Sequence, residues 1–454
     1  MVALHPVPSD SSSLDASIRD DDLVIALPPD AALDRAGADA LVELATTDPA
    51  DALYGDLVVA GRTVYRTAWS PTRLLSDAVA GTALAVRAGW LRRHDLGAGD
   101  PDLPFLLCRR GADVVHVPAV VSRHDRPPPA LDPATVRDHL ALAGVDVDHD
   151  RADATAPGVS IVVPTAGASL DDGTSAVQRL LDRLGPLPDP VELVLVVGDE
   201  FRGDPGTLAG PGRRIVRRPA GPFNFSAAVN LGVLHATRPL VLLLNDDTEP
   251  DGPGFLARMA RHLGDPSVSA VGALLRYPDG TVQHAGMVFD DARPLHPFVG
   301  WDPDDIAPHA GLVARDVIAV TGACMMLRRD DFLAVGGLSV GFPLSFNDVD
   351  LCVRLRRTGG RVVIEPAARL VHHETLTRAP EISADEWDRW IDRWGEIVDP
   401  WYHPAHHRPD DPHALARNAD HLPPRPDDPP VVVQARRPVL VSRVHRGRHA
   451  NPHR

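Results

Sequence analysis

The sequence contains no lysine, so all 46 of its basic residues are arginines. A GC-rich coding bias explains this absence, and we draw no functional conclusion from it. Cysteine is also scarce: Cys108, Cys324 and Cys352 each lie in an apolar stretch, and no CxxC pair occurs. We therefore expect buried thiols rather than disulfides or a zinc site, which fits a reducing cytoplasm.

Long hydrophobic runs are missing as well. No stretch approaches the roughly 18 consecutive apolar residues that indicate a membrane-spanning helix. The opening residues, MVALHPVPSDSSSLDASIRDDD, have neither the basic start nor the apolar centre of an export signal. The sequence therefore predicts a cytoplasmic protein. A net charge of −16 argues against a general nucleic-acid binder, because neutralising phosphates requires a basic face.

The chain of 454 residues is longer than one hydrophobic core usually supports, since single cores stop growing at about 250 to 300 residues. Two folded units are expected, and the 45 prolines favour long irregular connections between elements. Composition divides the chain into a disordered leader at 1–22, a first unit at 23–125, a linker at 126–158, a main domain at 159–402 and a tail rich in Pro, His and Arg at 403–454.

In the main domain, near-continuous apolar runs alternate with helical stretches. The runs VSIVVPT, VELVLVV and LVLLLNDD begin at Val159, Val191 and Leu240. This alternation predicts an α/β fold with a mostly parallel sheet covered by helices. Because the runs end in Pro-Thr, Gly-Asp and Asn-Asp-Asp, polar groups gather at the carboxyl edge of the sheet, where open α/β sheets bind ligands.

An internal repeat links the two units. GDPDLPFLLCRRGADVVHVPAVVSRH, from Gly99, aligns without a gap with NDVDLCVRLRRTGGRVVIEPAARLVHH, from Asn347. Upstream, PPD at 28–30 stands where NDD stands at 245–247. No counterpart of residues 159–240 is recognisable in the first unit. The first unit is therefore interpreted as a partial, degenerate copy. It lacks the early strands of a nucleotide-binding sheet, and with them the site for a nucleotide donor.

The acidic cluster NDD follows an apolar strand and should project its carboxylates into the ligand edge. Two carboxylates can hold a nucleotide diphosphate only through a divalent cation with oxygen ligands, which also neutralises the leaving diphosphate. A turn or a helix N-cap is the alternative explanation for Asp247 and its neighbours.

A second acidic cluster, FNDVDL at 346–351, opens a helical stretch that ends at a glycine pair. Capping of the helix dipole is one explanation for Asp348 and Asp350. The functional alternative is a general base that takes the proton of an attacking hydroxyl.

The sequence HHET at 372–375 follows a strand-like run. Adjacent strand residues point in opposite directions, so at most one of these histidines is expected to face a metal ion. A structural histidine pair on a strand is the alternative. The absence of HExxH argues against a zinc protease.

Together these motifs resemble the inverting nucleotide-sugar glycosyltransferases of family 2, which have the GT-A fold. The pieces occur in order: SIVVPT, FNFSAAVNLG, LLLNDDTEP, YPDGTVQHAG, TGACMMLRR, FNDVDLCVRLRRTGGRV and HHET. The variant is most similar to bacterial rhamnosyl- and galactofuranosyl-type transferases that build surface polysaccharides.

The resemblance implies a GT-A, Rossmann-like sheet and sugar transfer, with inversion, from a nucleotide diphosphate sugar to a glycan or lipid-linked acceptor. It also implies a divalent cofactor, Mn²⁺ or Mg²⁺. The residues that it assigns are Pro164 and Thr165 against the nucleotide, Asp199 near the base or ribose, Asn230 beside the donor, Asp246 beside the ribose or sugar, Asp247 and His372 on the metal, and Asp348 as the general base.

Two other functions compete with this interpretation. A catalytically inactive glycan-binding scaffold would have the same fold, and the lost acidic motif of the first unit indicates that such decay occurs. A nucleotidyltransferase would require a basic glycine-rich loop, but PTAGASLDDG, from Pro164, contains no basic residue. The arginine-rich tail after Asp428 is a candidate for weak peripheral contact with the inner face of an anionic membrane.

Overall fold

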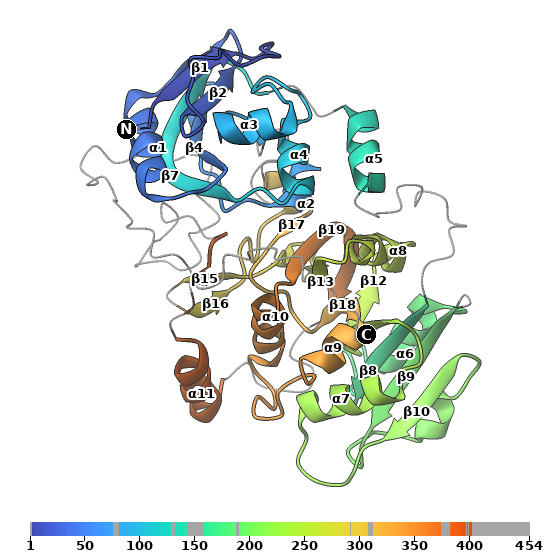
Figure 1. The fold of residues 1–454 in the computed structure, drawn as a ribbon. Coiled ribbons are helices and arrows are strands. Elements are labelled where there is room, and N and C mark those ends of the chain that lie inside the picture. Colours follow the sequence, from blue (N-terminus) through green and yellow to red (C-terminus); the bar gives the residue numbers. More distant parts are fainter. Residues whose placement is uncertain are drawn as a thin grey trace, which may run out of the picture.

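The computed structural model describes residues 2–75, 81–128, 132–142, 158–187, 190–290, 292–306, 312–373, 382–395, 397 and 399–401. Within them, a smaller N-terminal unit lies above a larger unit, shown in blue to cyan and in green to red (Figure 1). The predictions for residues 374–375 and for the tail at 403–454 lie outside the described residues.

The larger unit is built on a mixed sheet, which confirms the predicted α/β class. Its strands follow the order β10-β9-β8-β11-β18-β13-β19-β12, with β14 beside β13 and β17 beside β19. Their bounds are β8 Val159–Thr165, β9 Val191–Val197, β10 Arg213–Arg217, β11 Leu240–Leu244, β12 Thr248–Pro250, β13 Val268–Arg276, β14 Val282–His284, β17 Arg315–Asp316, β18 Cys324–Arg328 and β19 Arg361–His372. Strands β10, β9, β8 and β11 are parallel, whereas β18 and β12 run antiparallel to their neighbours.

Helices cover both faces of this sheet. On β8, Ile161 packs in the cluster that includes α6 and α8, whereas Val162 packs in the cluster that includes α7, α10 and α11. Neighbouring strand residues face opposite sides, so an unbroken apolar run is buried by both layers. The remaining elements of this unit are α6 Ala176–Leu184, η2 Pro205–Leu208, α7 Phe225–His235, α8 Phe255–Ala260, η3 Arg261–Gly264, β15 Val288–Asp290, β16 Arg293–Leu295, η4 Pro303–Asp305, α9 Arg329–Ala334, α10 Asn347–Arg357 and α11 Ala384–Trp394.

The N-terminal unit has its own sheet, in the order β1-β2-β6-β4-β7-β3 with β5 beside β4. Its elements are β1 Leu4–Pro8, β2 Leu23–Leu27, β3 Ala31–Leu33, α1 Arg35–Thr47, β4 Ala52–Val59, β5 Arg62–Val64, α2 Pro71–Leu74, β6 Ala85–Arg87, α3 Ala88–His94, α4 Leu103–Arg109 and β7 Val114–His124. A single helix, α5 Pro133–Leu142, lies in the described part of the linker.

The two sheets correspond strand by strand. The series β1-β2-β6-β4-β7-β3 matches β8-β11-β18-β13-β19-β12, and each neighbouring pair has the same parallel or antiparallel sense in both. The long strands β7 and β19 are both irregular at the aligned prolines. Consecutive residues of β4 pair with Val117 and Val120 of β7, and consecutive residues of β13 pair with Glu365 and Arg369 of β19. The repeat found in the sequence is therefore also a repeat of topology and register.

The leader prediction for residues 1–22 is wrong for the described part. Strand β1 lies within it and pairs with β2. Just before β2, the Asp22 carboxylate accepts the Ala3 N–H at 3.0 Å and forms an ion pair with Arg19. Strand β1 is also the counterpart of β8, so the first unit retains one element that the sequence comparison assigned as lost. The prolines in LHPVP argue against a strand when the sequence is considered alone. An edge strand tolerates them, because no strand on its outer side needs the N–H groups that proline lacks.

The two units meet through buried polar groups. The Ser70 hydroxyl donates to the Asp316 carboxylate at 2.6 Å, and the Arg361 guanidinium donates to the Thr72 hydroxyl at 3.1 Å. The Ala68 N–H donates to the Pro400 carbonyl at 3.0 Å. Since Ser70, Thr72 and Asp316 are all buried, this contact is a packed interface.

The cysteines are free thiols, as predicted. Cys324 and Cys352 are buried, whereas Cys108 is only partly buried. Among the residues that the structure describes, no helix has both the length and the apolar character needed to cross a bilayer.

Candidate functional site

The carboxyl ends of parallel strands bring several predicted residues to one edge of the larger sheet. Pro164 and Thr165 end β8, Asp199 follows β9 and is exposed, and Asp246 follows β11, which pairs with β8. The Thr165 hydroxyl donates to the Asp246 carboxylate at 2.5 Å and accepts the Gly167 N–H at 3.0 Å. The floor of this edge is therefore ordered by contacts between neighbouring strands.

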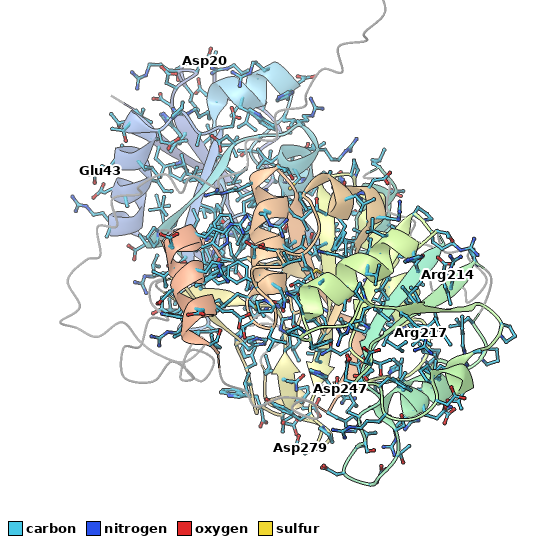
Figure 2. The ribbon with its side chains drawn as sticks, turned by 90° about the horizontal axis from the view of Figure 1, so that it is seen from below. Asp20, Glu43, Arg214, Arg217, Asp247 and Asp279 are labelled. Atoms are coloured by element: carbon cyan, nitrogen blue, oxygen red, sulfur yellow. The ribbon has the colours of Figure 1, made fainter. Side chains whose placement is uncertain are left out.

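Asp246 is in an environment that disfavours a bare negative charge. Burial raises the pKa of its carboxyl to about 7, and the nearby Asp247 carboxylate contributes to the increase, although the bond from Thr165 opposes it. Figure 2 labels Asp247 in the larger unit, away from Asp20 and Glu43 of the N-terminal unit. A cation at this position would relieve the repulsion between the two adjacent carboxylates.

Asp247 and His372 converge because β12 and β19 pair antiparallel, with Thr248 opposite His372. Asp247 Oδ1 lies 3.1 Å from His372 Nε2, yet this buried oxygen has no hydrogen-bond partner. His372 Nδ1 donates to Gln283 Oε1 at 2.7 Å, and Nε2 also lies 3.4 Å from the Asn245 side-chain amide nitrogen. Gln283 therefore fixes the orientation of the ring, with Nε2 directed toward Asp247.

This pair fits one side of a divalent metal site. A neutral imidazole nitrogen and a carboxylate oxygen are suitable ligands, and the Gln283 contact orients the ring as second-sphere partners do. Within the described ranges, no group of three or more His, Cys, Asp and Glu side chains could hold a metal ion. The remaining ligands would have to be phosphate oxygens and water, which is usual for Mg²⁺-type sites.

Asp348 lies in the first turn of α10, where the helix dipole stabilises a carboxylate. The residue before the helix, Phe346, has a left-handed backbone with φ 61°. The Asp348 carboxylate accepts the Gly322 N–H at 2.8 Å and the Val349 N–H at 2.8 Å. A Cβ on Gly322 would lie 3.3 Å from the Asp348 Cβ, so glycine permits the close approach.

The turn that contains Gly322 also contacts the acidic strand end. The Ala323 carbonyl accepts the Asn245 N–H at 3.0 Å, and β18 begins at the next residue, beside the end of β11. The structure therefore brings Asp348 and the NDD cluster to a single turn. They come from segments about a hundred residues apart, which meet here because β18 begins antiparallel to the end of β11.

Asp350 is excluded from the site by its own contacts. It is fully buried and pairs with Arg354 at 2.8 Å and Arg393 at 3.0 Å, and Trp394 Nε1 donates to it at 3.0 Å. These bonds anchor α11 to α10. The alternative that Asp350 serves as the base is therefore not supported.

Asn230, which is predicted to lie beside the donor, has both polar groups of its side chain bonded within the protein. Its side-chain amide donates to the Leu338 carbonyl at 2.8 Å and accepts the Leu338 N–H at 2.8 Å. Both polar groups are occupied by a loop from residues far along the chain. Asn230 thus joins α7 to the segment that leads into α10, and its place beside the donor stays a prediction.

Sequence reasoning assigned no role to Gln283 or His284, although both lie in the motif YPDGTVQHAG. Gln283 holds the ring of His372, and His284 Nε2 accepts the Thr321 N–H at 3.3 Å. The motif is one of those that carry the family resemblance, and this was the signal in the sequence that these residues have a role. Only the pairing of β14 with β13 reveals what they contact.

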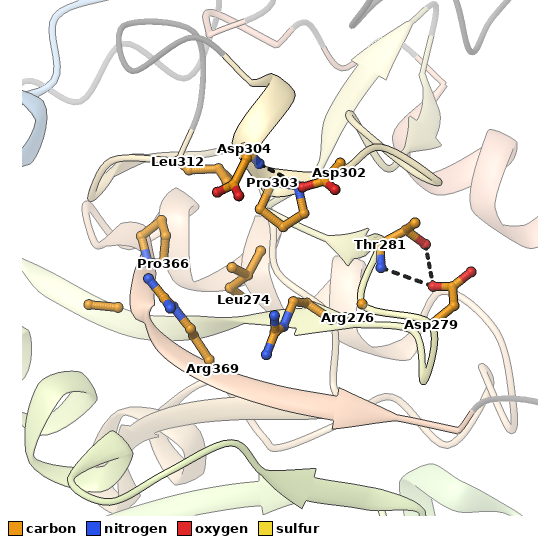
Figure 3. A pocket seen from close by; sticks show the side chains of 12 residues that line it. Leu274, Arg276, Asp279, Thr281, Asp302, Pro303, Asp304, Leu312, Pro366 and Arg369 are labelled. Atoms are coloured by element: carbon orange, nitrogen blue, oxygen red, sulfur yellow. Dashed lines mark hydrogen bonds between the residues drawn. The ribbon is translucent and has the colours of Figure 1, made fainter.

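A pocket of about 400 Å³ lies near this edge, between the β13–β14 hairpin, η4 and the irregular part of β19 (Figure 3). Arg276 and Arg369 contribute positive charge to its wall, whereas Asp279, Asp302 and Asp304 contribute negative charge. None of the predicted site residues lines it. Arg276 pairs with Val371, the neighbour of His372, so the pocket adjoins the site through β19.

Comparison with known proteins gives a family match. The model of the family described as "Glycosyltransferase like family 2" matches residues 157–393. This range contains every element of the candidate site and excludes the N-terminal unit.

Three relatives are similar over parts of their length. The protein y4gI of Sinorhizobium fredii is 34% identical over 274 residues, covering 55% of this chain and 29% of its own. The O-antigen biosynthesis protein RfbC of Myxococcus xanthus is 36% identical over 192 residues, covering 40% and 15%. The N-acetylglucosaminyl-diphospho-decaprenol L-rhamnosyltransferase of Mycobacterium tuberculosis is 28% identical over 144 residues, covering 30% and 47%. The chain thus spans less than half the length of each.

Two solved structures resemble the chain distantly. GalNAc-T7 with UDP, GalNAc and Mn²⁺ has 14% identity and a TM-score of 0.41, covering 59% of this chain and 58% of that one. The mannosyltransferase PcManGT of Pyrobaculum calidifontis with GDP-Man and Mn²⁺ has 18% identity and a TM-score of 0.35, covering 49% and 58%.

Proposed function

This chain belongs to the family 2 glycosyltransferases, and from that premise we propose that it transfers a sugar, with inversion, from a nucleotide diphosphate sugar to a hydroxyl of a glycan or lipid-linked acceptor. The observation that carries the proposal is the convergence of Asp247, His372 and Asp348 on one sheet edge. The names of two relatives, an O-antigen biosynthesis protein and a rhamnosyltransferase, favour cell-surface polysaccharide synthesis in a bacterium.

The donor side is proposed to be a divalent site. Asp247 Oδ1 and His372 Nε2 would hold Mn²⁺ or Mg²⁺, which would neutralise the departing diphosphate. Gln283 keeps the His372 ring in the metal-binding tautomer. Thr165 holds Asp246 at the floor, where its carboxyl is positioned to contact the ribose or sugar, while Pro164 and the exposed Asp199 border the nucleotide.

The acceptor side is proposed to depend on Asp348. As the acceptor oxygen forms a bond to the anomeric carbon, the bond from that carbon to the diphosphate oxygen breaks, and Asp348 takes the acceptor proton. The Gly322 N–H fixes this carboxylate, and the start of α10 stabilises its charge. One displacement on the face opposite the leaving group inverts the anomeric configuration.

The alternative is a catalytically inactive glycan-binding scaffold. Asp247 Oδ1 favours the enzyme, because it lies 3.1 Å from His372 Nε2 without a hydrogen bond, and a scaffold gains nothing from burying a carboxylate oxygen in this way. Release of nucleoside diphosphate from a donor, with and without divalent ion, separates the two functions.

Donor binding should stabilise the protein measurably. Thermal unfolding with a panel of UDP-, GDP- and dTDP-sugars plus Mn²⁺ is expected to identify one that adds about 2.7 kcal/mol at a concentration 100 times its dissociation constant. Omitting Mn²⁺ should remove most of this gain, because the diphosphate then meets bare carboxylates. A panel without any stabilising donor would count against the proposal.

We propose that residues 23–125, extended by the β1 segment, form a donor-free module that supports the catalytic unit. The described part of the unit has no counterparts of β9, β10, α6 and α7. Asp30 takes the place of Asp247 but pairs with Arg126 at 3.0 Å. His124, at the place of His372, instead contacts the Ser122 hydroxyl at 2.8 Å. Neither residue is arranged to bind a diphosphate.

The interface should contribute to stability. Ser70→Ala removes a donor to Asp316 Oδ2 and an acceptor for the Asp316 N–H, which is 3.0 Å from Ser70 Oγ. Leaving buried groups unpaired is expected to cost about 1 to 3 kcal/mol in the free energy of unfolding. Denaturant titration measures it, with Ser13→Ala as the exposed control. Equal stability of the two variants would show that the contact is dispensable.

Location and membrane contact are proposed from sequence alone. We propose a cytoplasmic protein whose arginine-rich tail, outside the described residues, adds weak attraction to anionic lipid. Such contact would bring the site close to a lipid-linked acceptor.

A further inference from the structure

His284 lies at the end of β14 and is only 1% exposed. Its Nε2 accepts two backbone N–H groups, from Gly286 and Thr321, each at 3.3 Å. Because Nε2 accepts, the ring proton is on Nδ1, which donates to His296 Nδ1 at 3.0 Å. The ring therefore bridges its own strand, the Thr321 turn and the segment that contains His296.

The Thr321 turn is held at three successive residues. His284 holds the N–H of Thr321, Asp348 accepts the N–H of Gly322, and the carbonyl of Ala323 accepts the Asn245 N–H. If the first of these contacts is lost, the Gly322 N–H is free to rotate away from the Asp348 carboxylate. The turn thus transmits the position of the imidazole to the proposed base.

A neutral ring is required for this contact. Burial holds the pKa of His284 well below its usual range, with further lowering by His296 and Arg315. A proton on Nε2 would face two backbone donors and break both bonds. The environment therefore keeps the acceptor available.

We infer that His284 is a positioning residue for sugar transfer, which holds the Thr321–Ala323 turn so that Gly322 fixes the carboxylate of Asp348. This inference rests on the proposed function, in which Asp348 is the base. His284 contacts neither donor nor acceptor in this account. Its effect should therefore appear in the turnover rate and not in nucleotide affinity.

Two amide substitutions form a matched pair. The oxygen of His284→Gln reaches approximately the position of Nε2 and can accept the Thr321 N–H, whereas that of His284→Asn ends near Nδ1 and cannot. We expect His284→Gln to keep kcat within about threefold of wild type, and His284→Asn to lower it by about 10- to 100-fold, as a displaced reacting group does. Calorimetry with UDP, GDP and dTDP in Mn²⁺ should give the same diphosphate affinity for both.

The decisive test is a double-mutant cycle with Asp348→Asn. If His284 acts through the base, adding His284→Asn to Asp348→Asn should lower the residual rate by less than about twofold. Independent losses that multiply, equal rates for the Gln and Asn variants, or a shifted diphosphate affinity would each overturn the inference. Circular dichroism checks folding, and His284→Met, which has similar volume and no strong acceptor, replaces His284→Asn if that variant does not fold.

A failure of the proposed function would give a different result. If Asp348 is not the base, Asp348→Asn alone would retain wild-type transfer, whatever the behaviour of the His284 variants. A silent Asp348→Asn therefore rejects the base, whereas an inactive Asp348→Asn with multiplicative His284 losses rejects only the positioning role.

Discussion

Asp348→Asn is expected to lower sugar transfer by about 10² to 10⁴, the usual cost of removing a general base. The asparagine has nearly the same shape and keeps an oxygen for the Gly322 N–H, so the fold and the turn should persist. It cannot accept the proton of the attacking hydroxyl. Steady-state transfer assays should therefore show reduced kcat with unchanged affinity for diphosphate and Mn²⁺.

The chain supplies its own control for this experiment. Asp100 stands at the repeat position of Asp348 and accepts the Asp102 N–H at 2.9 Å within its own turn. Asp100→Asn should leave transfer close to wild type. If Asp348→Asn retains more than about a tenth of wild-type transfer, the base is a different residue.

Asp247→Asn should have a comparably large effect on the donor side. The substitution keeps the volume of a half-buried side chain and removes the charge that would bind the cation. We expect metal-stimulated transfer to fall by at least about 100-fold and the diphosphate to lose its Mn²⁺-dependent binding. Asp30→Asn, at the matching position of the first sheet, should change neither quantity.

Chelation gives a second test of the metal. Transfer by the wild-type protein should stop with EDTA and return with added Mn²⁺. Wild-type turnover by Asp247→Asn in the presence of EDTA would mean that no cation operates at this site. The stability of the variant should be near normal or higher, since Asp247 Oδ1 has no hydrogen-bond partner to lose.

Local patterns explain why much of the site could be predicted. Strand β11 is an unbroken apolar run, so the position of Asp246 and Asp247 at its carboxyl end follows from the sheet. Helix α10 and strand β19 could be predicted because the internal repeat contains the same pattern twice. These features depend on residues that are close together in the sequence.

Contacts between distant segments explain what the sequence did not reveal. Asp350 and Asp348 are two residues apart and chemically identical, and only the packing of α11 buries the former. The motif that contains Asn230 predicts a place beside the sugar donor. The sequence did not reveal that its side-chain amide donates to a loop carbonyl more than a hundred residues later. Gln283 and His284 acquire their roles only when β14 pairs beside β13.

Strand β1 illustrates a different difficulty. Its two prolines give it the composition of a loop, and it pairs with β2, where Asp22 accepts the Ala3 N–H from 19 residues away in the sequence. Comparison with β8 identifies it, because both are parallel neighbours of the strand that leads to the acidic or degenerate motif. Topology here was more informative than composition.

Calorimetric titration of the full-length protein with UDP, GDP and dTDP, in Mn²⁺ and in EDTA, tests the central claim most directly. The account predicts that at least one diphosphate binds in Mn²⁺ and not in EDTA, that Asp247→Asn abolishes this binding, and that Asp348→Asn preserves it. Binding that is equally tight in EDTA, or that survives Asp247→Asn, would contradict the assignment of this sheet edge as a metal-dependent donor site.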